Sequence, residues 1–279
     1  MNPDTNLASS SKPYQQVMTI TPSMAQRWLE GANTANRRLS MAYAERLAGE
    51  IRADRWMLTH EGIAFSPHGV LLDGQHRLQA IVLADKPVTM VVWFNISPKA
   101  LLAINSGKAR SIADTLMLAG GCGQVNNHDL ATLRAMLGGM GSPPTLSAAQ
   151  AAEALQRHGE AIEFASVYLP RNTGRGISIG TTRAVIARAY YSADANRLAE
   201  FCRVLTSSVA TKPEDEPAVL LIHYLQRTLG MHSQTVRDRY AKTERALWAY
   251  LRREKLSRLY GTSEELFPLP EERKAQTAA

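Results

Sequence analysis

One ten-residue segment, 71–80, combines a carboxylate, an imidazole and a guanidinium around a single glycine. Its pattern predicts a strand that ends near Asp73, a tight turn at Gly74 and a helix whose first turn holds His76 and Arg77. The unpaired N–H groups and the positive dipole end of such a helix attract anions, and an arginine adds a bidentate fork. The segment therefore indicates a phosphate-binding site.

The side chains of this segment also suggest acid–base chemistry. Asp73 stands where a carboxylate orients a hydroxyl or a metal-bound water, and His76 is suited to donate to a phosphate oxygen or to transfer a proton. A structural interpretation stays open beside this one, because aspartate before a helix is a common cap and His76 and Arg77 are free to pair with surface acids.

A second candidate phosphate loop spans residues 105–111, where small residues and two cations precede a helix that Ser111 is suited to cap. It is not a Walker A loop, because the preceding glycine and strand are missing. The alternative is a basic loop before a capped helix. No metal site is expected, since His60 and His68 have no cysteine or paired carboxylates at ligand spacing. The candidate phosphate ligands in this loop are Asn105, Ser106, Lys108 and Arg110.

The elements that must position these residues alternate between strand and helix. Apolar residues recur at helical spacing after Ser40, and glycine in a short polar turn joins two β-like runs into a hairpin. The expected order is a strand at 17–20, a helix around 28–29, a helix at 41–51, a hairpin at 63–66 and 70–72, a helix at 76–83, a strand at 88–94 and a helix at 99–104.

Beyond about residue 125 nearly every segment predicts helix, so the expected fold class is α+β, a small sheet-and-helix domain followed by an all-α domain. The expected division is a flexible lead-in at 1–16, the first domain at 17–120, the helical domain at 121–262 and a flexible tail at 263–279.

The stretch 236–260 holds eight Lys or Arg residues against three Asp or Glu, and we expect it to form one helical segment. Interleaved tyrosines and a tryptophan suit phosphate contacts with some base stacking. An amphipathic helix with a solvated basic face explains the same pattern equally well. The nucleic-acid candidates are Arg245, Arg252, Arg253, Lys255 and Arg258.

The ordered series of elements resembles the ParB/sulfiredoxin superfamily, and the sequence Asp-Gly-Gln-His-Arg at 73–77 looks most like its DGQHR branch, which is linked to phage or mobile DNA and to DNA modification. The resemblance covers roughly residues 17–118. It implies a nucleotide-binding domain of mixed sheet and helix. The residues that it implies contact nucleotide phosphates are Gly74, Gln75, His76 and Arg77, with Arg37 or Arg38 reaching the same pocket.

The chain departs from the superfamily pattern at two points. Gln75 stands where sulfiredoxin has its catalytic cysteine, so that redox reaction lacks its nucleophile. Asn105 matches a ParB ligand, but Ile104 replaces the metal-binding glutamate and Arg110 is displaced, which puts magnesium-dependent CTP hydrolysis of the ParB kind in question.

The resemblance implies a protein that binds ATP or CTP and acts on or near DNA, either hydrolysing the nucleotide or transferring a phosphoryl group to a hydroxyl, for example on a modified base. Asp73, or else Glu50 or Glu61, is available to activate that hydroxyl. The alternative is a non-catalytic DNA-binding regulator that senses a nucleotide, and a nuclease ranks third. Bound Mg²⁺ and a homo-oligomer are both compatible with the resemblance.

Composition limits the remaining classes. The 279 residues carry a formal charge of +7, with 45% apolar and 20% charged residues, which is typical of folded globular chains. Two cysteines are too few for a disulfide scaffold, so a reducing cytoplasm is expected. We expect no secretory signal and no membrane span, because the most apolar stretch, 88–104, is interrupted by polar residues.

Overall fold

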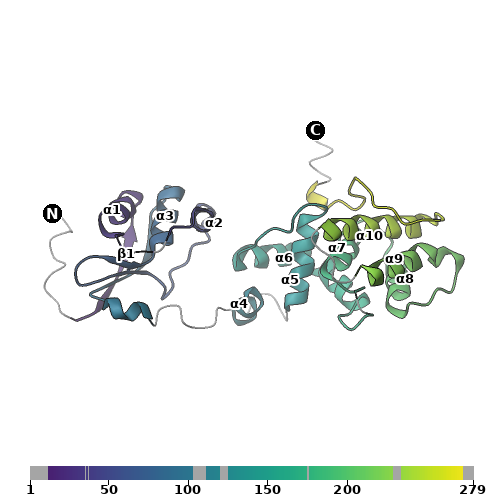
Figure 1. Cartoon of the computed structure of the whole chain (residues 1–279), viewed down its shortest axis with the longest axis horizontal. Helices are drawn as coiled ribbons and strands as arrows, with labels where there is room; N and C mark the ends of the chain where they lie inside the picture. Colours follow the sequence, from purple (N-terminus) through teal and green to yellow (C-terminus); the bar gives the residue numbers. More distant parts are fainter. Residues whose placement is uncertain are drawn as a thin grey trace. The chain divides into compact units, whose positions relative to one another are not determined.

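The computed structural model describes residues 12–34, 36, 38–102, 111–119, 125–174, 176–228 and 234–272. Contacts divide the chain into two compact units, Met1–Ala109 and Arg110–Ala279. The first unit contains a small sheet with helices, and the described residues of the second form helices and loops (Figure 1). The expected mixture of helix and strand is thus confirmed. Among the described residues, no helix is both long enough and apolar enough to cross a membrane.

The first unit has a four-stranded mixed sheet with three α-helices on one face (Figure 1). Its elements are β1 (Tyr14–Ile20), α1 (Pro22–Ala32), α2 (Met41–Arg52), β2 (Ile63–Phe65), β3 (Leu71–Asp73), α3 (Gln75–Ala84), β4 (Val88–Phe94) and the 3-10 helix η2 (Pro98–Leu102). The strand order is β1-β4-β2-β3, in which β4 runs antiparallel to β1 and parallel to β2, and β2 and β3 form the expected antiparallel hairpin.

Alternation along β4 decides which face of the sheet the helices cover. Every second residue of this strand is buried, while Thr89 between two of them is exposed, as expected for a strand with one covered face. The buried side chains of β4 pack with Leu78 and Ile81 of α3 in one apolar core. These buried residues of β4 are Val88, Met90, Val92 and Phe94.

Side-chain caps start the first two helices of this unit. The Thr21 side chain accepts a hydrogen bond from the Met24 N–H at the start of α1, and the Ser40 side chain accepts one from the Tyr43 N–H at the start of α2. Gly69 takes a φ of +73° in the turn of the hairpin, a conformation that glycine adopts without strain.

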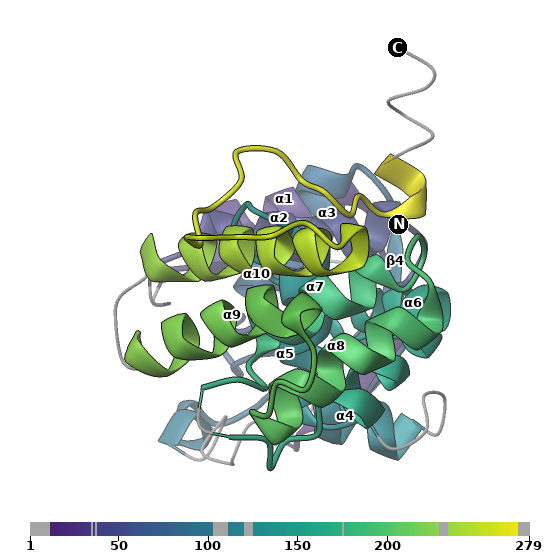
Figure 2. The same ribbon diagram turned by 90° about the vertical axis from the view of Figure 1, so that its right-hand side faces the viewer.

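The second unit is a helical bundle around α7, which contacts α5, α6 and α10. Its elements are α4 (Ile112–Ala119), α5 (Asn127–Gly138), α6 (Ala148–Tyr168), α7 (Gly180–Ala189), α8 (Ala195–Ser207), the 3-10 helix η3 (Pro213–Asp215), α9 (Glu216–Arg227) and α10 (Gln234–Arg252). Figure 2 shows α7 in the middle of this group. All its residues from Thr182 to Ala189 are buried, two arginines included.

The two units divide about ten residues earlier than the boundary expected at residue 120. Helix α4 belongs to the second unit because it packs against α5 and α6, with Ala113 and Leu116 in the helical core. At the other end, the lead-in expected at 1–16 already includes the first residues of β1, whose Tyr14 stacks on Phe94.

The expectation of a flexible tail from residue 263 is wrong for residues 263–272. Phe267 and Leu269 are 2% and 5% exposed and join the helical core. Figure 2 shows this segment, in yellow, running beside α10. The segment carries buried apolar side chains. The charged residues that follow Pro270 make its composition resemble that of a solvated tail.

The single helix expected over 236–260 is also wrong, because α10 ends at Arg252. Arg253 takes a φ of +57°, its N–H bonds to the Tyr250 carbonyl, and the Glu254 N–H bonds to the Ala249 carbonyl. This pattern is a Schellman motif, which closes a helix by satisfying its last carbonyl groups. The basic residues after Arg252 therefore lie on a loop.

Candidate functional site

The start of α3 is built from three segments that meet at one edge of the sheet. Gly74 has a φ of +102°, and a Cβ there would lie 2.5 Å from Ile63 Cδ1 and 3.2 Å from Ile63 Cα. Glycine is therefore required both for the backbone conformation and for the close approach of β2. No side chain caps α3 in the described structure, and no acidic residue lies in its first turn. Such a helix start suits an anion.

Arg77 lies in this first turn and joins it to the segment before β2. Its guanidinium donates to the Glu61 carboxylate at 2.6 Å and to the Gly62 carbonyl at 3.0 Å, and it lies 3.5 Å from the Asp73 carboxylate. The Arg77 side chain is 20% exposed and that of Glu61 is 64% exposed. An arriving phosphate competes with an exposed carboxylate for this fork, so Arg77 is reachable by a ligand although it is paired.

His76 holds the loop that precedes α2. Its Nε2 atom accepts a hydrogen bond from the Ser40 N–H at 3.0 Å, and its ring lies edge-on to Tyr43 with 5.2 Å between centroids. The Arg46 guanidinium stacks over the Tyr43 ring, with its central carbon 4.9 Å from the ring centroid. The geometry makes His76 a link between α3 and α2.

The other expected residues of this motif are also held by polar contacts. Asp73 accepts from the Gly74 N–H at 2.8 Å, so its carboxylate braces the turn. Gln75 is 5% exposed, and its side-chain oxygen accepts from Asn33 at 3.4 Å. Asn36, which directly precedes Arg37 and Arg38 in the sequence, donates to the Leu71 carbonyl at 2.7 Å.

The remaining candidates of the first unit are only partly placed. Arg38 is exposed on the loop before α2. Glu50, one candidate for activating a hydroxyl, instead pairs with Arg55 at 2.8 Å near the end of α2. Arg37 and the second phosphate loop, with Asn105, Ser106, Lys108 and Arg110, lie outside the described residues. Among the described residues, no group of three or more His, Cys, Asp or Glu side chains is arranged to hold a metal ion.

Sequence reasoning missed several side chains that shape this site. Asn33 and Tyr43 contact Gln75 and His76, and neither was expected to do so. Glu61 was expected only as a group that activates a hydroxyl, but its carboxylate pairs with Arg77. The pair Asn33 and Asn36 gives a usable signal, because two asparagines between helices in front of a glycine-led helix are suited to bridge backbone groups. The Asn36 side chain does donate to Asn33 Oδ1 at 2.7 Å.

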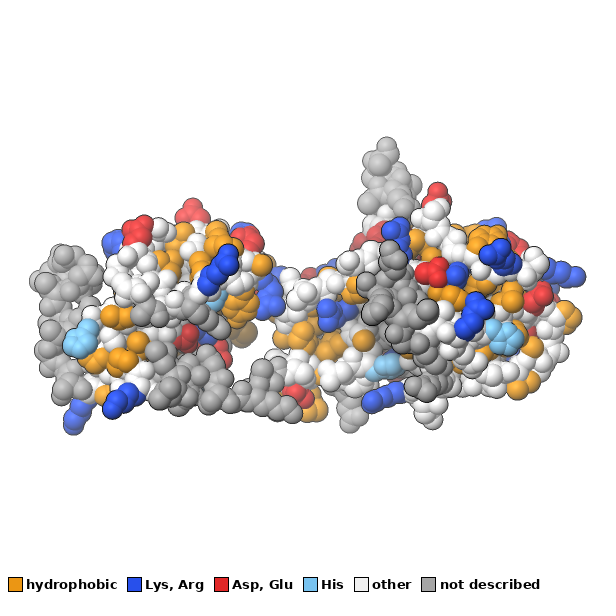
Figure 3. Space-filling model, viewed as in Figure 1, with side chains coloured by type: hydrophobic (Ala, Val, Ile, Leu, Met, Phe, Trp, Pro, Cys, Tyr) orange, Lys and Arg blue, Asp and Glu red, His pale blue; other side chains and the backbone are white. Residues whose placement is uncertain are grey.

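The C-terminal basic residues differ in how they present their charge. Arg245 is 15% exposed and pairs with Glu254 at 2.9 Å, so its guanidinium is occupied within the unit. Arg252 is exposed and stacks over Trp248, and Arg253 is 67% exposed with Glu214 3.7 Å away. Lys255 and Arg258 are exposed. Basic and acidic side chains alternate over the face of the unit seen in Figure 3, so charge alone does not outline an interface there.

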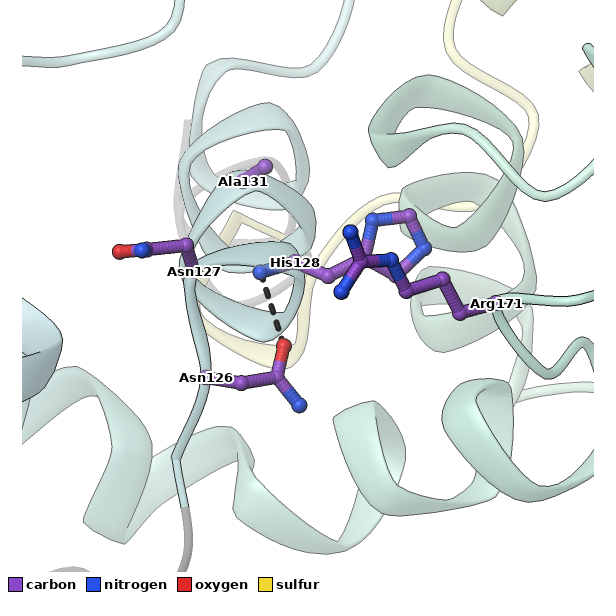
Figure 4. Close-up of a pocket in the computed structure, with 5 residues that line it drawn as sticks. All are labelled: Asn126, Asn127, His128, Ala131 and Arg171. Atoms are coloured by element: carbon purple, nitrogen blue, oxygen red, sulfur yellow. Dashed lines mark hydrogen bonds between the residues drawn. The ribbon is translucent and has the colours of Figure 1, made fainter.

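A polar cavity of about 380 Å³ lies at the start of α5. Figure 4 shows the Arg171 guanidinium beside the His128 ring, with Asn126 capping the helix. Burial and the nearby Arg183 guanidinium lower the pKa of His128, so the imidazole is neutral at neutral pH. Because His128 is neutral and Asn126 already caps the helix, Arg171 is the charged group that this cavity presents.

Comparison of the chain with models of known protein families, with curated proteins and with solved structures found no match in any of the three.

Proposed function

We propose that the first unit binds the phosphates of ATP or CTP at the start of α3, in the manner of the ParB/sulfiredoxin superfamily, and that the protein uses this nucleotide on or near DNA. The start of α3 carries the proposal. It has no side-chain cap in the described structure, Gly74 lets the backbone approach closely, and Arg77 supplies a partly exposed fork beside it. Backbone N–H groups with one arginine make a phosphate site.

Hydrolysis of the nucleotide, or phosphoryl transfer to a hydroxyl, follows from the same groups. Arg77 would stabilise negative charge on the transferred phosphoryl, and Asp73 is the carboxylate nearest to the helix start that is able to orient the attacking hydroxyl. The Asp73 side chain is 39% exposed, so one of its oxygens remains within reach of a ligand while the other accepts from Gly74.

A second candidate function is a nucleotide-sensing DNA regulator without catalysis. It is favoured by the contacts of His76 and Arg77, which are engaged with Ser40 before α2 and with Glu61 before β2. A site built only to bind would use these residues to couple the bound nucleotide to the loops before α2 and β2.

Calorimetric titration of the full chain with ATP and CTP, with and without Mg²⁺, tests nucleotide binding. We expect Arg77→Ala to weaken binding by about tenfold or more, because charge-assisted bidentate contacts are the strong ones. Arg38→Ala, at an exposed position, should weaken binding without a risk to folding. Lys86→Ala is the matched control, because this cation lies just beyond the opposite end of α3, where it pairs with Asp54.

Unchanged affinity in folded Arg77→Ala and Arg38→Ala chains would overturn the phosphate site. Incubation with radiolabelled ATP and CTP, with and without DNA, then separates the two functions. Release or transfer of labelled phosphate supports the enzyme, whereas binding without turnover supports the regulator.

A further inference from the structure

A cavity of about 590 Å³ in the second unit has no role in nucleotide binding at α3. It lies between the start of α8, the last turn of α10 and residues 266–268. Its lining combines the indole of Trp248 and apolar side chains with two arginines, Arg197 and Arg252. An aromatic surface next to cations is the composition that binds a nucleobase and its phosphate.

Trp248 and Arg252 form the stacking surface of this cavity. The Arg252 guanidinium carbon lies 4.1 Å from the Trp248 ring centroid, and the Phe267 ring meets the indole edge-on at 5.8 Å. Phe267 is buried and fixes the indole, whereas Arg252 is exposed and free to shift toward a ligand. A base entering here finds an ordered aromatic ring and a flat cation.

Two buried charged residues hold the far wall of the cavity in place. The Glu244 carboxylate accepts from the Leu266 and Phe267 N–H groups at 3.3 and 3.4 Å, and Arg188 donates to the Phe267 carbonyl at 2.8 Å. Both Glu244 and Arg188 are 0% exposed. The wall is therefore pre-formed, as the walls of small-molecule sites usually are.

The charge around the cavity favours an anion. Among the described residues that line it, Asp194 is the one acidic residue, and the Asp194 carboxylate already accepts from the Arg197 N–H as the cap of α8. The Arg197 guanidinium donates to the Tyr250 carbonyl at 2.8 Å and lies 3.8 Å from the Glu214 carboxylate, so Arg252 is the exposed cation that the lining offers to an anion. Arg253, Lys255 and Arg258 continue the positive charge along the exposed loop after α10.

We propose that this cavity binds one unpaired nucleotide of a single-stranded nucleic acid, with its base against Trp248 and its phosphate at Arg252. The proposal rests on the nucleic-acid part of the proposed function and gives it a substrate class. A base within a duplex is already stacked and paired, so it does not enter without the cost of unpairing. The loop after Arg252 then follows the neighbouring phosphates.

Fluorescence anisotropy with a labelled oligothymidylate of about twelve nucleotides, and with a duplex of equal length, tests this proposal on the full chain without added ATP or CTP. We expect tighter binding of the single strand. Trp248→Leu should weaken it by about tenfold, because stacking on one aromatic ring contributes that much. Trp248→Phe should restore most of the affinity because it keeps a ring.

Arg252→Gln, at an exposed position, keeps the test valid if Trp248→Leu fails to fold, and it should also weaken single-strand binding. Arg237→Gln is the matched control, an exposed arginine near the other end of α10.

Equal binding of strand and duplex, or full affinity in folded Trp248→Leu and Arg252→Gln chains, would overturn the proposal. Binding of a labelled phosphotyrosine peptide that Trp248→Leu and Arg252→Gln weaken, with no binding of the oligothymidylate, would overturn the proposal and assign the cavity to peptides instead. Because no ATP or CTP is present, a failure at α3 leaves these outcomes unchanged.

Discussion

The Nε2 atom of His76 accepts a hydrogen bond from the backbone N–H of Ser40 across 36 residues of chain. The motif histidine is thereby tied to the residue that caps α2. Because the lone pair of Nε2 is used in this bond, that nitrogen does not take a proton from a substrate while the bond lasts. His76 therefore positions the loop before α2. Through this bond, a nucleotide bound at the start of α3 would change the position of that loop.

Replacing His76 with Phe should loosen the start of α2. The phenyl ring keeps the contact with Tyr43 but leaves the Ser40 N–H without its acceptor, at a cost of about 1 kcal/mol. Hydrogen exchange followed by mass spectrometry should show faster exchange in peptides covering 38–46. Peptides from α5 to α7 serve as the internal control. Unchanged protection at 38–46 would show that the bond does not hold this loop.

Gly74→Ala should destabilise the first unit by about 2–4 kcal/mol, because alanine is strained at a φ of +102° and its Cβ would clash with Ile63. Gly49→Ala is the matched control. Gly49 lies inside α2 with no atom within 4 Å of an added Cβ, so alanine there should raise stability by up to about 1 kcal/mol. Urea denaturation curves of the two variants should shift in opposite directions. A Gly74→Ala chain that is as stable as the original chain would show that Gly74 is not constrained.

Stability should fall between acid and neutral pH because of Glu244. Burial, with the nearby Glu265 carboxylate adding to it, raises the pKa of Glu244 from 4.5 to about 7. The folded state therefore keeps a proton in this range that the unfolded state has lost, so the stabilisation is complete below about pH 4.5 and is gone above about pH 7. The full effect is on the order of 3 kcal/mol.

Glu244→Gln isolates this contribution, because glutamine does not titrate. Urea denaturation at several pH values should give similar stability for the two chains near the acid end and a more stable variant above about pH 7. His158, whose pKa burial lowers, adds a slope of opposite sign, but it is present in both chains and cancels in the difference. A constant difference between the chains across the range would contradict the raised pKa.

Much of the first unit follows from local sequence chemistry. The Thr21 and Ser40 side chains cap the two helices that follow them, and alternating apolar residues place β4 with one face covered. These signals are readable because a cap or a strand face depends on residues only two to four positions apart. The glycine turn into α3 is local in the same sense, and the sequence showed it directly.

The partners of the charged side chains were decided only by the tertiary structure. Arg77 meets Glu61 from 16 residues away, and Arg188 meets Glu265 from 77 residues away. No periodicity encodes such separations. The composition of residues 263–272 predicted a tail. In the structure, the buried side chains of Arg188 and Glu244 bond to the backbone of Phe267 and hold this segment in place.

The sequence by itself determined where the glycine-led start of α3 lies, because a helix start with glycine and arginine is a property of a few adjacent residues. The tertiary structure decided which of those residues are reachable, that His76 holds a loop, and that Trp248 and Arg252 line a cavity. Burial and pairing depend on what distant segments bring to the same place, and that is settled only when the whole unit packs.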